Sequence, residues 1–186
     1  MTPLSRLLAL VAMLGCLAGP VAAAPAEDWA KATAGAEARD GLLRTFVDRK
    51  TNRILVRLPA PDTEGVSGRF IYQSSLATGL GSTPIGLDRA EMGRALVVVF
   101  RRAGRKIILQ AENHGFRADG GGAAETRAVR DSFAISNIWS ADVAAEEPDG
   151  AVLVDLTSFL TQDTLDIAAR LKARRQGGFR AAPALT

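Results

Sequence analysis

Short runs in which apolar and polar residues alternate, separated by turn residues, make up most of the chain. In residues 53–58, Ile54, Val56 and Leu58 recur at every second position. A period of two places such side chains on one face of a β-strand. Residues 43–48 have a similar texture and are joined to this run by four polar residues, so the two segments predict a β-hairpin.

Residues 95–100 and 106–111 predict a second hairpin around an Arg/Gly turn at 101–104. The first arm is apolar on both faces, which is typical of a central strand that is covered on both sides. Three further strands are predicted at residues 69–74, 132–138 and 151–156. At least six strands at this spacing predict a mainly β fold, with antiparallel hairpins in a sheet or sandwich.

One α-helix is predicted near the C-terminus, where Leu165, Ala168 and Leu171 share a face. Asp163 can cap its first turn, and Gly177-Gly178 is expected to end it. Basic residues in its last turns suit the helix dipole and are expected to form a solvated face, with a contact surface for anionic partners as the alternative. These residues are Arg170, Lys172, Arg174 and Arg175.

Residues 1–24 have the pattern of a signal peptide, so we expect an exported protein, periplasmic or extracellular. Arg6 precedes a long uncharged run that ends in small residues suited to a cleavage site. Two alternatives stay open: an uncleaved anchor, or processing at Cys16 with attachment of a lipid. Residues 25–40 are expected to be a linker, with a short helix docked through Trp29 as the alternative. Residues 41–178 are expected to be a single strand-rich domain, and 179–186 a tail.

Composition narrows the classes of function. The net charge is +3, and +2 once Arg6 is removed, which is too small to argue for nucleic-acid binding. Aromatic residues are only 5% of the chain and leave little for base stacking. If cleavage falls after Cys16, the exported chain has no cysteine, and so no disulfide, thiol nucleophile or thiolate ligand.

The candidate chemistry is sparse because His114 is the only histidine. A zinc hydrolase with an HExxH motif needs two histidines one helical turn apart and a glutamate base. No Gly-x-Ser-x-Gly elbow exists for a serine hydrolase, so His114 is interpreted as the end of a strand that enters a loop. We therefore assign no catalytic, cofactor-binding or metal-binding residue.

Two other segments invite a functional interpretation and favour a structural one. Residues 79–86 are glycine-rich, but Leu87 and Asp88 follow where a phosphate-binding loop needs Lys and Ser/Thr. We expect a connection that requires positive φ, with Asp88 and Arg89 paired or pinning it. Asp155 and Ser158 do not form the repeated motif of an aspartic protease, and local bonds from their side chains to the backbone are expected.

Several segments together resemble the non-catalytic N-terminal domain of bacterial exported zinc-dependent metalloproteases. The similar segments are Asp40–Leu43, Thr78–Ser82, Gly86–Arg89, Glu125, Ala128–Ala134, Val152–Asp155 and Phe159–Leu160. In that family a domain of unknown function follows the signal peptide, and a metzincin-like catalytic domain comes later. The resemblance covers about residues 30 to 178, and none of its motifs is catalytic.

The resemblance implies a non-catalytic module whose partner is a metallopeptidase catalytic domain. Zinc is implied only for that domain, whose histidine motif has no counterpart here, and the chain looks like a truncated relative. The alternative is an independent periplasmic binding or scaffold module. An intact enzyme is the least favoured of the three hypotheses.

Overall fold

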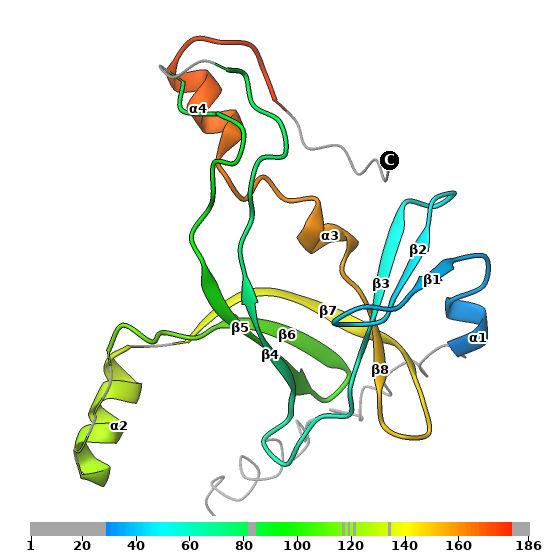
Figure 1. The fold of residues 1–186 in the computed structure, drawn as a ribbon. Helices are drawn as coiled ribbons and strands as arrows, with labels where there is room; N and C mark the ends of the chain where they lie inside the picture. The colour runs from blue at the N-terminus through cyan, green and yellow to red at the C-terminus, as the bar shows by residue number, and fades with distance from the viewer. Residues whose placement is uncertain are drawn as a thin grey trace, which may run out of the picture.

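The computed structural model describes residues 29–81, 85–116, 118, 120, 122–133 and 135–179. Within these residues, eight antiparallel strands form one sheet in the order β1-β2-β3-β8-β7-β6-β5-β4 (Figure 1). The fold is therefore mainly β, as the alternation of apolar residues predicts, and its helices are short. Residues 1–28 lie outside the described part of the chain, and the expected signal peptide lies among them.

The first hairpin forms where it is predicted. β2 (Thr45–Asp48) pairs with β3 (Arg53–Leu58), with Phe46 opposite Leu55. Asn52 adopts a positive φ of 53° in the turn between them. The Asp48 carboxylate accepts bonds from the turn amides, as short acidic side chains commonly do.

The second hairpin is longer than predicted. β5 (Leu96–Ala103) pairs with β6 (Lys106–Ala111), so Arg101 and Arg102 belong to the strand and the turn is at Gly104. β5 lies between β6 and β4 (Val66–Tyr72), and this confirms its interior position. Val99 is only 1% exposed although its neighbours Val98 and Phe100 point to the opposite face.

β7 (Ser136–Glu146) joins the two halves of the sheet. Its first part pairs with β6 and its last part with β8 (Val152–Asp155), and the register shifts in both ladders. The long curved strand is clear in Figure 1. The strand predicted over residues 132–138 is wrong in its bounds, because residues 123–132 form a helix and the strand runs on to residue 146.

The main core lies inside the curve of the sheet. Side chains from β3 and β8 meet those from β5 and β6, and all are nearly fully buried. α3 (Thr157–Leu160) closes this core by inserting Phe159, whose ring lies 5.1 Å from that of Tyr72 and 6.0 Å from that of Trp139. The buried residues that the two halves of the sheet contribute to this core include Val56, Leu58, Val98, Phe100, Ile107, Leu109, Val152 and Val154.

A smaller core lies on the other face of β2, β3 and β8. Phe46, Leu55 and Leu153 pack there against Trp29 of α1 (Trp29–Ala32). The rings of Trp29 and Phe46 meet edge to face at 6.0 Å. β1 (Glu37–Arg39) adds an edge strand beside β2, so residues 29–39 belong to the fold. The alternative of a short helix docked through Trp29 therefore holds there, in place of the expected linker.

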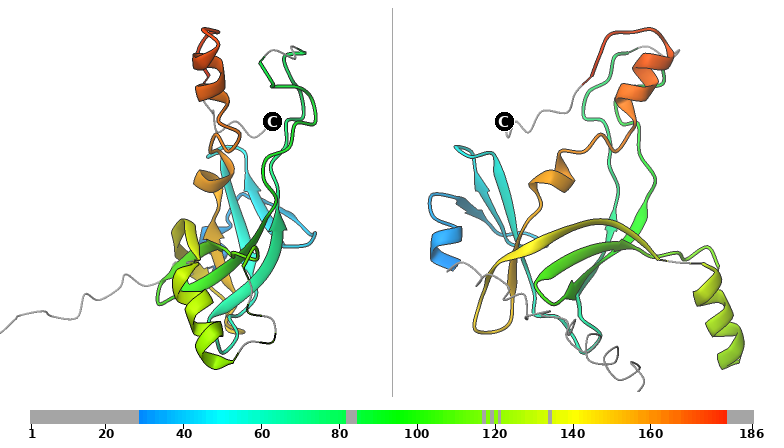
Figure 2. Two further views of the ribbon diagram at one scale, coloured as in Figure 1. Left: turned by 90° about the vertical axis from the view of Figure 1, so that its left-hand side faces the viewer. Right: turned by 180° about the vertical axis from the view of Figure 1, so that it is seen from behind.

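The helices α2 (Ala123–Ser132) and α4 (Ile167–Ala173) project from the sheet (Figures 1 and 2). None of the described side chains of α2 is buried. α4 is the predicted C-terminal helix, but it ends before Gly177, since Arg175 takes the positive φ that closes it. Among the residues that the structure describes, no helix is long and apolar enough to cross a membrane.

Candidate functional site

The connection between β4 and β5 extends far beyond the sheet and lies beside α4 (Figures 1 and 2). We call residues 73–95 together with α4 the projecting lobe. Backbone bonds hold the connection together, with the Leu76 amide donating to Glu91 O and the Ala90 amide to Leu76 O, each at 2.9 Å. Arg170 of α4 pairs with Glu91 and donates to Gly86 O at 2.8 Å, which ties the helix to the connection.

An apolar cavity of about 400 Å³ opens within the projecting lobe. Leu76, Leu80 and Leu87 line it from the connection, and Ile167 and Leu171 line it from α4. Phe179 lies against the same cavity, although the sequence places it at the start of a tail. Leu80 is 59% exposed and Phe179 40%, so large apolar side chains remain in solvent at this site. Its size and its lining are those of sites that bind apolar groups.

The glycine-rich segment shapes one wall of this cavity. Gly81 and Gly86 have φ values of 63° and 68°, which confirms the expected positive φ. A Cβ on Gly79 would lie 2.6 Å from the Cα of Asp88, so only glycine lets the two arms of the connection approach so closely. The Leu80 amide donates to Leu87 O at 2.8 Å across this approach. Residues 82–84 lie outside the described part, and the pinning contact is made by Arg170.

The ends of α4 follow from local sequence. The Asp163 carboxylate accepts from the amides of Ile167 and Ala168 at 2.8 and 2.9 Å, which confirms its expected role at the start of the helix. At the other end the Gln176 amide donates to Leu171 O at 3.0 Å, a bond typical of a helix closed by a residue with positive φ. This places the basic C-terminal turn immediately after the cavity-lining Leu171.

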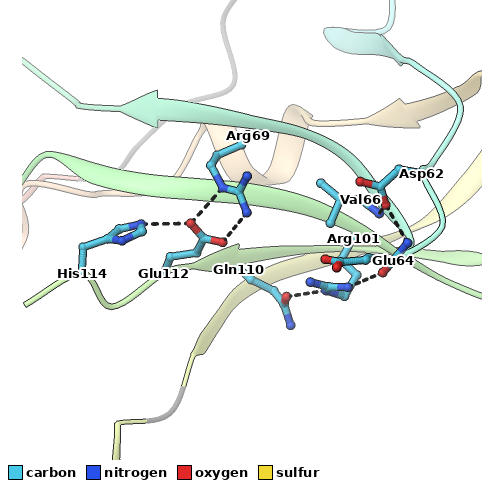
Figure 3. Close-up of polar contacts among 8 residues, drawn as sticks. All are labelled: Asp62, Glu64, Val66, Arg69, Arg101, Gln110, Glu112 and His114. Atoms are coloured by element: carbon cyan, nitrogen blue, oxygen red, sulfur yellow. Dashed lines mark hydrogen bonds and ion pairs between the residues drawn. The ribbon is translucent and has the colours of Figure 1, made fainter. Parts of the chain in front are cut away.

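His114 belongs to a separate polar cluster on the outer face of the sheet, shown in Figure 3. Its Nε2 lies 2.9 Å from Oε2 of Glu112, whose carboxylate also accepts two bonds from Arg69 at 2.9 and 3.0 Å. The bonds from Arg69 chiefly, with a smaller contribution from His114, hold the pKa of Glu112 below its ordinary value. Among the described contacts no hydroxyl or thiol is bonded to His114, so the cluster presents no nucleophile. The bonds from Arg69 link β4 to the segment that follows β6, across the intervening β5.

Asp155 makes the local bonds that the sequence predicts. It accepts from the backbone amide of Thr157 at 2.9 Å and from its hydroxyl, and from Arg53 Nε at 2.9 Å. Burial raises the pKa of this carboxyl, but the bonds from Thr157 and Arg53 outweigh it and lower the pKa overall. Ser158 differs from the prediction, because its hydroxyl oxygen accepts from the indole Nε1 of Trp139 at 2.9 Å.

The residues present do not fit the zinc that the resemblance implies for a catalytic domain. Within the described ranges no three side chains of His, Cys, Asp or Glu gather as a metal site. The single imidazole faces a carboxylate that is already committed to Arg69. Zinc in a catalytic site takes three protein ligands, so no step is derived through a metal in this chain.

The fold and the site define a curved antiparallel β-sheet module with a projecting lobe that carries an apolar cavity. The family described as Domain of unknown function (DUF5117) matches residues 90–182, half of the chain, and the chain belongs to it. That match includes β5 to β8 and all of α4. No curated protein and no solved structure matches the chain significantly.

The cavity is not predictable from the sequence alone. The glycine-rich segment and the apolar face of the helix are each visible there, but nothing in their spacing shows that they meet. The one signal in the sequence is the pair of leucines, Leu80 within the glycine-rich segment and Leu87 directly after it.

Proposed function

We propose that this chain is an exported, non-catalytic module that docks against a partner, and that the partner is the catalytic domain of a zinc-dependent metallopeptidase. The resemblance of its segments to the first domain of exported metalloproteases supports this choice of partner. Membership of a family of domains of unknown function is compatible with it.

The observation that carries the proposal is the contrast between the two kinds of surface. On the sheet, ionisable side chains are engaged with one another, as in the pairs Arg57–Glu147, Arg102–Glu146 and Arg53–Asp155. In the projecting lobe, large apolar side chains surround an open cavity. Charges that are paired within the fold already have their partners, whereas exposed apolar groups around a cavity are typical of a binding surface.

Affinity capture tests the proposal. The tagged full chain is expressed in the cells that export it, and captured proteins are identified by mass spectrometry. We expect a protein with an HExxH zinc motif among them. A Leu153→Asp variant is the control: it buries a carboxylate at a position of 0% exposure, which unfolds the sheet and must abolish capture.

Two results contradict the proposal. One is capture only of proteins without a zinc-peptidase motif, which favours the independent binding or scaffold module. The other is equal capture by the parent chain and the Leu153→Asp variant, because a docking module must be folded to dock.

A further inference from the structure

We infer that the cavity of the projecting lobe receives a large apolar side chain of a protein partner, and that carboxylates flanking that side chain meet the basic end of α4. This inference rests on the proposed function and names the chemistry that its partner must present. It concerns only the lobe, so it can fail while the proposed function stands.

The apolar half of the inference comes from the cavity itself. Its volume of about 400 Å³ is at the low end of the range for binding pockets, and its walls are chiefly leucine, isoleucine and phenylalanine side chains. Leu76, Ile167 and Leu171 are partly buried, and the cavity is open to solvent. Filling it with an aliphatic or aromatic side chain removes apolar surface on both sides from water.

The charged half comes from the residues that follow. Arg174 is the residue that ends α4, three positions after Leu171, and Arg175 follows it with a positive φ, so both lie at the end of the helix that lines the cavity. Both are exposed, as is Lys172, and the described contacts include no acidic partner for any of these three. Arg170 differs from these three, because its guanidinium already forms an ion pair with Glu91.

No nearby acid on the same segment offsets this charge. In residues 164–179 the only carboxylate is Asp166, which lies at the opposite end of α4. The partly negative C-terminus of the helix stabilises these positive side chains at their positions. Their N–H groups that point to solvent can still bind a carboxylate. A partner that fits presents an apolar side chain between Asp or Glu residues, since a cationic segment would be repelled.

The test uses a display library of random short peptides, selected on the immobilised full chain. Selected peptides are then synthesised, labelled and titrated by fluorescence anisotropy at low and high salt. We expect sequences with a large apolar residue next to Asp or Glu, and affinity that falls as salt screens the exposed charges.

Two variants locate the binding. Arg174→Glu with Arg175→Glu reverses two exposed charges without touching the cavity, and we expect peptide affinity to fall about tenfold or more. Leu171→Glu places a carboxylate in the cavity and should abolish binding. The matched control is Arg127→Glu, an exposed arginine on α2, which should leave affinity unchanged.

Several outcomes overturn the inference: no peptide is selected, the selected peptides lack acidic residues, or their affinity is the same for all variants. A second copy of the chain as the occupant also overturns it, and would appear as a concentration-dependent dimer that Leu171→Glu disrupts. If a zinc-peptidase partner is captured equally by the parent chain and the charge-reversed variant, the proposed function stands and this inference fails. If acidic peptides bind as expected but no such partner is captured, the reverse holds.

Discussion

Replacing Phe159 by alanine tests whether α3 closes the main core. Phe159 is 6% exposed and its ring meets those of Tyr72 and Trp139. A buried Phe→Ala substitution costs about 3–5 kcal/mol, a range that already includes the loss of ring contacts such as these. We therefore expect the free energy of unfolding to fall by about 4 kcal/mol.

Urea unfolding followed by tryptophan fluorescence measures this loss. With a slope of about 2 kcal/mol per molar urea, the midpoint should fall by about 2 M. The control is Phe116→Ala, since Phe116 is 53% exposed and its ring stacks on that of Phe133, which is itself exposed. That control should cost less than about 1.5 kcal/mol. Equal losses for the two variants, or a loss below about 1 kcal/mol for Phe159→Ala, would refute the reasoning that α3 seals the core.

Three further predictions concern single residues. Despite its burial, the hydrogen bonds of Asp155 hold its pKa below the ordinary value, so its share of the stability is present at neutral pH and is lost as pH falls below about 4. The difference in urea midpoint between the parent chain and Asp155→Asn should shrink as pH is lowered through this range, and a difference that does not change with pH contradicts the prediction. Gly79→Ala should speed hydrogen exchange of the Leu80 amide, because the added Cβ meets backbone, whereas Gly177→Ala, which meets nothing within 4 Å, should not. Asp163→Ala should cost about 0.5–2 kcal/mol by removing the acceptor of two helical amides, and an unchanged urea midpoint would show that this cap is dispensable.

Much of the sheet could be predicted because its signals are local. The β2–β3 hairpin follows from the recurrence of Ile54, Val56 and Leu58 at every second position, because a period of two places all three side chains on the same face of a β-strand. The bounds of β7 could not be predicted in the same way. Its first part pairs with one neighbour and its last part with another, so the pattern of buried positions changes within the strand.

The edge of the fold was harder still. Trp29 is the only large apolar residue in residues 25–40, and no periodic stripe marks a helix there. The helix exists because the ring of Trp29 packs on Phe46, a contact between separate segments that local propensity does not contain.

The candidate site was predictable only in its parts. The apolar face of the C-terminal helix and the glycine-rich segment are both visible in sequence. Their meeting depends on Arg170, which reaches residues about 80 positions earlier to hold Gly86 and Glu91. The same long-range pair removes Arg170 from the solvated basic face that the helix pattern indicates.

The central proposal is that the chain is a non-catalytic module that docks against a partner. The most direct measurement incubates the purified full chain with zinc and a denatured protein substrate, with metal content determined in parallel. We predict no chelator-sensitive cleavage and no tightly held zinc, because the chain has a single imidazole and the residues that the structure describes hold no cluster of metal ligands. Stoichiometric zinc together with cleavage that a chelator abolishes would contradict it.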